Sequence, residues 1–277
     1  MTTTATSKLY LSRLLLNPRS RQVWSELAQP YEMHRTLMRA FPPATKAAEG
    51  TAREEFAVLF RAEFDDSGGV AKVYVQSVKE PDWSFLQGLP DYLCRNGETP
   101  SISCKDVMPS YANLRAGQTL RFRLRANPSK KAKRNDEGVD LTKPRPGTDR
   151  LGRPKAQSKR VELTRESEQI DWLIRKGKER EKGVPGGFEL LFKEARDRSG
   201  QARQIPRVTV CPEGKEKGRK REGAGGHVTI HLAVLFDGLL RVTDAEQFRK
   251  TLTRGIGSGK AFGFGLLSVA PCSSAGL

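Results

Sequence analysis

Apolar and polar positions in the first hundred residues alternate between strand-like and helix-like periods. A largely apolar run over residues 8–17 predicts a strand. In the helix expected over residues 30–41, Met33, Leu37 and Phe41 are spaced to form one buried stripe. The expected elements of this half are strands over 8–17, 56–64, 70–78 and 101–107, and helices over 20–27, 30–41 and 83–93. Their order, β-α-β-β-α-β, is that of a ferredoxin-like domain.

The same order repeats in the second half of the chain. In the strand over 119–126, apolar residues alternate with Arg121, Arg123 and Arg125, so we expect one buried and one uniformly basic face. The other expected elements are helices over 166–176 and 244–252 and strands over 205–210, 228–236 and 262–270. We therefore predict an α+β fold of two tandem ferredoxin-like (RRM-like, βαββαβ) domains. Their expected spans are residues 1–110 and 118–277.

Two basic insertions enlarge the second domain. The first, residues 129–160, is rich in Lys, Arg, Pro and Gly and leads from the basic strand to Lys159 and Arg160. We predict that it is a hairpin arm that follows phosphates. The second, residues 178–226, contains the run Lys215-Glu-Lys-Gly-Arg-Lys-Arg221. For this segment, a solvated flexible loop is as good an interpretation as an RNA-binding one.

The balance of charge favours an acidic polymer as partner. The chain has 49 Lys and Arg against 32 Asp and Glu, a formal net charge of +17. Nucleic acid is the leading candidate, and an anionic membrane is less favoured because no apolar run approaches the ~20 residues of a spanning helix. The four cysteines form no CxxC pair, which argues against a zinc site or a disulfide framework. We expect a cytoplasmic protein without a metal or other cofactor.

A glycine-rich segment separates the last expected helix from the last expected strand. Residues 254–271 hold five glycines, and Lys260 lies among them. Successive free N–H groups in such a loop form a concavity that binds anions. Nucleotide-cofactor sites have the opposite order, strand then glycines then helix, so we reject that interpretation. A helix cap and a tight turn explain one or two glycines, whereas five with a lysine favour phosphate contacts by Arg254, Gly257, Gly259 and Lys260.

The three histidines are the candidates for metal binding or catalysis. His227 and His231 are expected on one strand face, and no carboxylate or cysteine is spaced to complete a metal site. His34 shares its helix with Tyr31 and Arg35, which together would supply a titrating group, a phenol and a cation. From the helix alone, a structural histidine is the default interpretation.

Five co-linear motifs change that balance. They are Tyr10-Leu-Ser-Arg13, Tyr31-x-x-His34-Arg-x-Leu ending at Phe41-Pro42, Phe122-Arg-Leu-Arg-Ala-Asn-Pro128, Ser167-Glu-Gln-Ile-Asp-Trp-Leu173, and Gly255-Ile-Gly-x-Gly-Lys-Ala-Phe-Gly-x-Gly-Leu-Leu-Ser-x-Ala-Pro271. Together they resemble the CasE family, the CRISPR repeat-processing endoribonucleases of the type I-E Cascade complex. The resemblance covers both halves of the chain in order and is least in the two insertions.

The resemblance implies two ferredoxin-like domains, binding of the CRISPR repeat hairpin RNA, and one metal-independent cut at the base of its stem. It also implies retention of the product with other Cascade subunits as partners. His34 matches the catalytic histidine of the family and Tyr31 its tyrosine partner. Lys159 and Arg160 match its basic hairpin, and the glycine loop with Lys260 would contact phosphates.

Two other functions remain open. A non-catalytic RNA-binding subunit of a ribonucleoprotein would share every binding feature and differ only in whether His34 matters for cutting. An enzyme acting on small phosphorylated substrates would need clusters of acidic metal ligands, which the sequence does not show.

Overall fold

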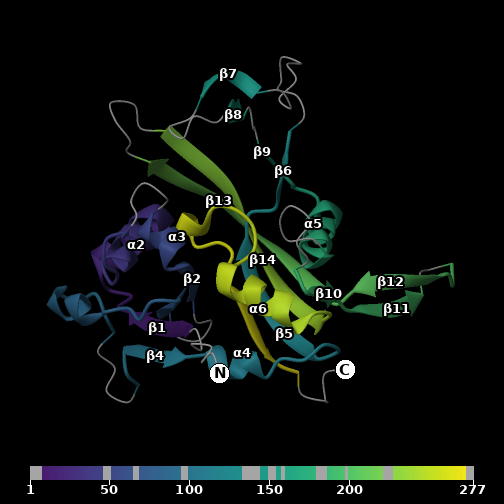
Figure 1. The fold of residues 1–277 in the computed structure, drawn as a ribbon, viewed down its shortest axis with the longest axis horizontal. Helices are drawn as coiled ribbons and strands as arrows, with labels where there is room; N and C mark the ends of the chain where they lie inside the picture. The colour runs from purple at the N-terminus through teal and green to yellow at the C-terminus, as the bar shows by residue number, and fades with distance from the viewer. Residues whose placement is uncertain are drawn as a thin grey trace, which may run out of the picture.

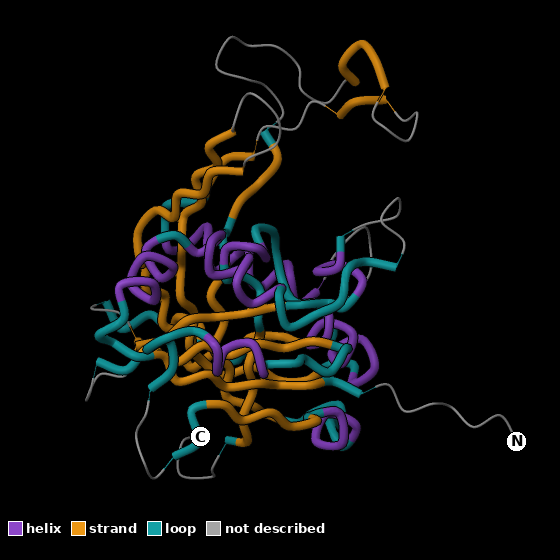
Figure 2. The backbone as a smooth tube through the Cα atoms, turned by 90° about the vertical axis from the view of Figure 1, so that its left-hand side faces the viewer, coloured by secondary structure: helices purple, strands orange, loops and turns teal. Residues whose placement is uncertain are grey.

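A computed structural model describes most of the chain. The described residues are 8–45, 51–64, 69–94, 99–132, 144–148, 154–156, 160–178, 186–196, 199–220 and 227–272. The chain forms a mixed α/β structure around two antiparallel sheets (Figure 1). Figure 2 shows the sheets and the helices that cover them from the side.

The first sheet has the strand order β2-β3-β1-β4. Its strands are β1 (Tyr10–Leu16), β2 (Leu59–Phe64), β3 (Ala71–Ser77) and β4 (Ile102–Asp106), and its helical segments are α1 (Arg21–Ala28), α2 (Pro30–Met38), α3 (Ala52–Glu55) and η1 (Ser84–Gly88). The Ser20 side chain caps α1 by accepting from the Val23 N–H. Met33 and Leu37 of α2 are buried in the core with Leu14 of β1, which confirms the predicted stripe.

The second sheet has the strand order β10-β14-β5-β15, with β13 also paired to β14. Its strands are β5 (Thr119–Ala126), β10 (Phe188–Leu190), β13 (Val208–Lys220), β14 (His227–Val242) and β15 (Leu267–Pro271). Helices α5 (Glu166–Lys178) and α6 (Ala245–Arg254) pack on it through Trp172, Leu173, Phe248 and Leu252. A short helix, α4 (Met108–Ala112), joins the two halves.

Short strand pairs extend from the second sheet. They are β6 (Ser129–Lys131) with β9 (Arg160–Glu162), β7 (Pro144–Thr148) with β8 (Pro154–Ala156), and β11 (Phe192–Arg196) with β12 (Ala202–Pro206). Strands β6 and β9 pair antiparallel, so the base of the predicted arm is a hairpin. In the described part of the second insertion, the basic run lies within β13 as far as Lys220, so these residues form a strand and not a loop.

Several predicted boundaries were wrong. Helix α2 ends at Met38, because the next three residues bond three positions back in a tighter turn that ends at Phe41. The helix expected over 83–93 is reduced to the 3₁₀ segment η1. The strand expected over 205–210 is divided at Arg207 between β12 and β13.

The last strand also begins later than predicted. Strand β15 starts at Leu267 and not at Phe262, because Gly263 and Gly265 have positive φ and keep the preceding residues in a loop. That loop contains a 3₁₀ turn, η2 (Lys260–Phe262).

The two sheets meet where β2 lies against β5 and β15. Arg61 of β2 is 3% exposed, and its Nη1 donates to the Leu266 carbonyl at 2.9 Å, while its Nη2 donates to Ser268 at 3.0 Å. Gln76 of β3 donates to the Leu252 carbonyl at the end of α6. Buried polar groups from one half therefore fix the position of the other.

The alternation of buried and exposed residues predicted for β5 is confirmed. However, two of the three arginines on its basic face form ion pairs with carboxylates. Arg123 pairs with Asp237 at 2.7 Å and with Glu63, and Arg125 pairs with Glu213 at 2.6 Å and with Glu216. Acidic side chains from both halves thus neutralise most of a surface that the sequence presents as uniformly basic. Within the described residues, no helix has the length and apolar character needed to cross a membrane.

Candidate active site and nucleic-acid interface

Helix α2 places Tyr31 and His34 side by side, since residues three apart share a helix face. Their ring centroids are 5.9 Å apart. The His34 ring stacks on Phe60 of β2 with an interplanar angle of 9°, and the Tyr31 ring packs against Phe262 of the glycine loop at 5.7 Å. Both side chains are thus held by aromatic contacts, one from each half of the chain.

The environment of His34 keeps its imidazole uncharged. Burial, with a further contribution from the positive charge of Arg53, lowers the pKa of His34 from 6.5 to about 4. Its Nδ1 is buried and has no hydrogen-bond partner in the described part of the chain. A neutral imidazole at pH 7 has a lone pair that can accept a proton.

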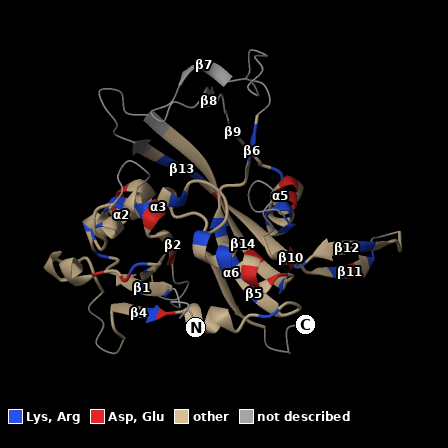
Figure 3. Cartoon of the chain, in the orientation of Figure 1, with Lys and Arg blue, Asp and Glu red and all other residues tan. Residues whose placement is uncertain are grey.

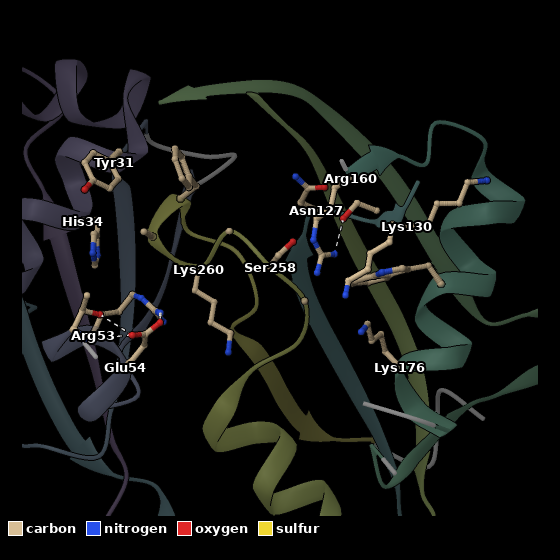
Figure 4. Close-up of a pocket in the computed structure, with 18 of the residues that line it drawn as sticks. Tyr31, His34, Arg53, Glu54, Asn127, Lys130, Arg160, Lys176, Ser258 and Lys260 are labelled. Carbon is tan, nitrogen blue, oxygen red and sulfur yellow. Dashed lines mark hydrogen bonds and ion pairs between the residues drawn. The ribbon is translucent and has the colours of Figure 1, made fainter. Parts of the chain in front are cut away.

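These two residues form part of one wall of a cleft of about 1180 Å³. Helices α2 and α3 form this wall, β6, β9 and α5 form the opposite wall, and the glycine loop lies between them (Figure 4). The basic residues that line the cleft are Arg53, Lys130, Lys131, Arg160, Arg175, Lys176 and Lys260. Glu54 is the one acidic residue among the described residues that line it, so the cleft is suited to a polyanion. Figure 3 shows basic residues on β6 and α5.

The glycine loop presents free donors at this cleft. The backbone N–H groups of Gly257, Ser258 and Gly259 have no hydrogen-bond partner among the described residues. Gly259 has φ +76°, and a Cβ there would lie 2.9 Å from the Phe264 ring. Glycine is therefore required both by the backbone conformation and by packing, and successive free N–H groups of this kind are suited to an anion.

Comparison with known proteins agrees with this geometry. A family profile described as "CRISPR associated protein" matches residues 9–271. The chain belongs to this CRISPR-associated protein family. It is 38% identical over 264 residues to the CRISPR-associated endoribonuclease Cse3 of Thermus thermophilus, covering 95% of this chain and 100% of that protein. It is 26% identical over 263 residues to the Cascade subunit CasE of Escherichia coli, with the same coverage.

A solved structure is similar over the same length. This is Thermus thermophilus Cse3 bound to an RNA representing a pre-cleavage complex, with a TM-score of 0.64 and 34% identity over 95% of this chain and 100% of that one. The resemblance to the CasE family that the motifs indicate is thus confirmed.

The structure brings only some of the predicted site residues of this CRISPR-associated protein together. Tyr31, His34, Arg160, Gly257, Gly259 and Lys260 line the cleft. The Lys260 ammonium also donates to the Arg254 carbonyl at the end of α6, at 2.6 Å. Lys159 lies outside the described residues.

The other predicted residues lie elsewhere. Arg35 pairs with Glu32 at 2.8 Å on a solvent-facing side of α2 and does not line the cleft. Arg121 and Arg254 are exposed outside the cleft, and Arg123 and Arg125 are the paired residues of the sheet interface. Adjacent helix residues diverge by about 100°, which is why Arg35 does not follow His34 into the cleft.

Several cleft residues were not named as site residues from the sequence, although Lys130 and Lys131 lie in the arm predicted over residues 129–160. Lys130 and Lys131 directly follow the basic strand motif, and Arg175 and Lys176 end α5 on the side that faces the arm. Asn127 lines the cleft and bonds the His231 Nδ1 at 2.7 Å. No three His, Cys, Asp or Glu side chains within the described ranges are grouped as metal ligands would be, and His231 takes this amide partner instead.

We expect His34 to make the protein less stable in acid. Its imidazole binds a proton near pH 6.5 in the unfolded chain but only near pH 4 in the folded one, so stability is lost as the pH falls between these values. The loss should reach about 3 kcal/mol by pH 4. Urea unfolding of the wild type and His34→Phe at several pH values would measure it. The two proteins should diverge below pH 6.5, and parallel curves would contradict the assigned burial.

Proposed function

We propose that this protein is a metal-independent endoribonuclease that binds the CRISPR repeat stem-loop of precursor crRNA and cleaves it at the base of the stem. The observation that carries the proposal is the position of an uncharged His34 beside Tyr31 on one wall of a cleft whose other wall is basic. The relative named as an endoribonuclease and the RNA-bound Cse3 structure support it.

In the proposed reaction, the ribose 2′-oxygen attacks the adjacent phosphorus. A bond from the 2′-oxygen to phosphorus forms as the bond to the 5′-oxygen breaks, which leaves a 2′,3′-cyclic phosphate and a 5′-OH. One group must take the 2′-OH proton, and another must supply a proton to the 5′-oxygen. With Nδ1 of His34 buried, Nε2 is the nitrogen left to move a proton, and the Tyr31 phenol supplies a hydrogen bond at the same phosphate.

The basic wall is suited to an RNA stem. A-form RNA hides its base edges in a deep groove, so a protein recognises it chiefly through shape and phosphates. The base of the arm formed by β6 and β9 contributes Lys130, Lys131 and Arg160, and α5 contributes Lys176. The free N–H groups of the glycine loop then lie between this binding surface and His34 (Figure 4).

We propose that each half is a ferredoxin-like domain, residues 1–110 and 118–277. When β13 is left out of the second sheet and strands are numbered within each half, both sheets follow the order 2-3-1-4 that this fold requires. The first half departs from the pattern, because the only helical segment described between its third and fourth strands is the 3₁₀ segment η1.

The protein is further proposed to keep its cleaved RNA and to act in the cytoplasm with other Cascade subunits. The name of the Escherichia coli relative, a Cascade subunit, supports this. A non-catalytic RNA-binding subunit is the alternative, since the basic cleft alone accounts for binding. The placement of His34 and Tyr31 in that cleft favours the enzyme.

The test is an incubation of the purified protein with an end-labelled CRISPR repeat hairpin from the same genome, in EDTA. The expected result is one cut at the stem base, with a 2′,3′-cyclic phosphate on the upstream fragment. A hairpin with a single 2′-deoxy nucleotide before the cut should remain intact but bind equally well. Tight binding of the natural hairpin without a cut would favour the scaffold alternative.

Salt should weaken the binding, because cations displaced from the phosphates are released. Lys130→Ala and Arg160→Ala should each reduce the slope of log K against log salt by about one. Lys193→Ala removes the same charge from β11, outside the cleft, and should leave the slope unchanged. Filter binding of the 2′-deoxy hairpin across a salt series gives the slopes. Equal slopes for all four proteins would exclude this wall as the RNA site.

A further inference from the structure

The proposed reaction needs a third group besides an acid and a base. The phosphate gains negative charge as the 2′-oxygen attacks, so the transition state requires a fixed positive group beside the reacting phosphorus. Arg35, the cation expected from sequence, cannot supply it from its pair with Glu32, where its side chain is 63% exposed and faces away from the cleft.

Arg53 occupies the position that Arg35 was expected to fill. It lies on α3, and Figure 4 shows it beside His34 on the same wall of the cleft. Its side chain is only 19% exposed although it ends in a charge. The short helix that carries it leads directly into β2, whose Phe60 stacks on His34. One continuous segment of backbone therefore positions both the guanidinium and the support of the imidazole.

Within the described residues, one nitrogen of the Arg53 guanidinium forms a hydrogen bond and the other two do not. Its Nη2 donates to the Glu54 carboxylate at 2.9 Å. Glu54 is itself held by a capping box with Thr51, which fixes the first turn of α3. Among the described residues, Nε and Nη1 of Arg53 have no hydrogen-bond partner. These donors are available to a phosphate oxygen in the cleft, and a guanidinium donates to phosphate through paired N–H groups.

We infer that Arg53 binds the scissile phosphate and stabilises the charge that develops on it. This inference rests on the proposed function and adds a catalytic residue to it. Without RNA, Arg53 disfavours a second positive charge on His34. A phosphate bound between the two groups would offset the repulsion between Arg53 and a protonated His34, whereas burial, the larger cause of the low pKa of His34, would remain.

The test compares Arg53→Ala and Arg53→Lys with Arg21→Ala, which removes one positive charge from the exposed surface of α1. Single-turnover cleavage at saturating protein should fall about 10² to 10³-fold in Arg53→Ala, with partial recovery in Arg53→Lys. Arg21→Ala should cleave at the wild-type rate. The affinity of Arg53→Ala for the 2′-deoxy hairpin should fall less than the rate.

A second measurement distinguishes a direct contact between Arg53 and the phosphate from an indirect effect of the substitution on the structure of α3. Replacing the scissile phosphate of the 2′-deoxy hairpin by a neutral methylphosphonate should weaken binding to the wild type but not to Arg53→Ala. An equal loss in both proteins, or undiminished cleavage by Arg53→Ala, would overturn the role of Arg53 and leave the proposed nuclease intact. A wild type that does not cut would overturn the proposed nuclease and this role with it.

Discussion

Replacing His34 by phenylalanine is expected to slow cleavage of the repeat hairpin by about 10² to 10⁴-fold while leaving RNA affinity nearly unchanged. The rate falls because no group remains to move the proton. The affinity stays because a neutral imidazole contributes no charge to phosphate binding. Phenylalanine keeps a flat ring against Phe60 and so preserves the packing of α2 on β2. Single-turnover kinetics and filter binding on the same hairpin measure both quantities.

Two further variants test whether the loss of cleavage rate is due to the missing imidazole and to the missing phenol hydroxyl. Imidazole added to His34→Ala, which leaves a space at the ring, should restore part of the rate, whereas His34→Phe should not respond. Tyr31→Phe keeps the ring contact with Phe262 and should slow cleavage through loss of the hydroxyl alone. Full activity of His34→Phe would show that another group moves the proton and would remove His34 from the proposed catalytic site.

Replacing Arg61 by methionine should lower the free energy of unfolding by about 3 to 5 kcal/mol. The change leaves the buried Leu266 carbonyl and Ser268 hydroxyl without their donor, and it leaves Glu63 without its 2.6 Å partner. Urea denaturation followed by tryptophan fluorescence measures the loss. RNA binding at a temperature where the variant is folded should also weaken, since Arg61 fixes one half against the other.

Arg241→Met is the matched control for this prediction. Arg241 pairs with Glu189 at 3.4 Å, and both side chains are about half exposed. Exposed pairs contribute 0 to about 1 kcal/mol, so the control should unfold close to the wild type. Equal stability of Arg61→Met and Arg241→Met would mean that the sheet interface does not depend on the buried guanidinium.

The strands and helices were predictable wherever one face of an element is buried and the other is not. In β5 the strict alternation gave the observed limits, and in α2 the spacing of Met33 and Leu37 gave the buried face. Predictions of element boundaries failed where contacts with distant parts of the chain, and not the local pattern of apolar residues, decide the backbone conformation. Phe262 is apolar, like a strand residue, yet it packs across the cleft on Tyr31 and belongs to a loop.

The candidate site was predictable only in part, because charge along the sequence does not reveal which partner a charge finds. Arg123 and Arg125 meet carboxylates from β2, β13 and β14, which lie far away in the sequence. Arg53 was missed for the opposite reason. Its signal, a Thr51-x-x-Glu54 capping box, lies in a helix of 4 residues that has no apolar period of its own.

The cleft is formed by two walls that come from different halves of the chain. His34, Tyr31 and Arg53 belong to the first half, and the lysines and arginines of β6, β9 and α5 belong to the second. With the roles proposed above, substitutions in the second wall would change which hairpin is bound without altering the groups that break the bond. In evolutionary terms, the binding wall of such a protein can change together with the sequence of the CRISPR repeat, while the residues of the cutting site stay the same.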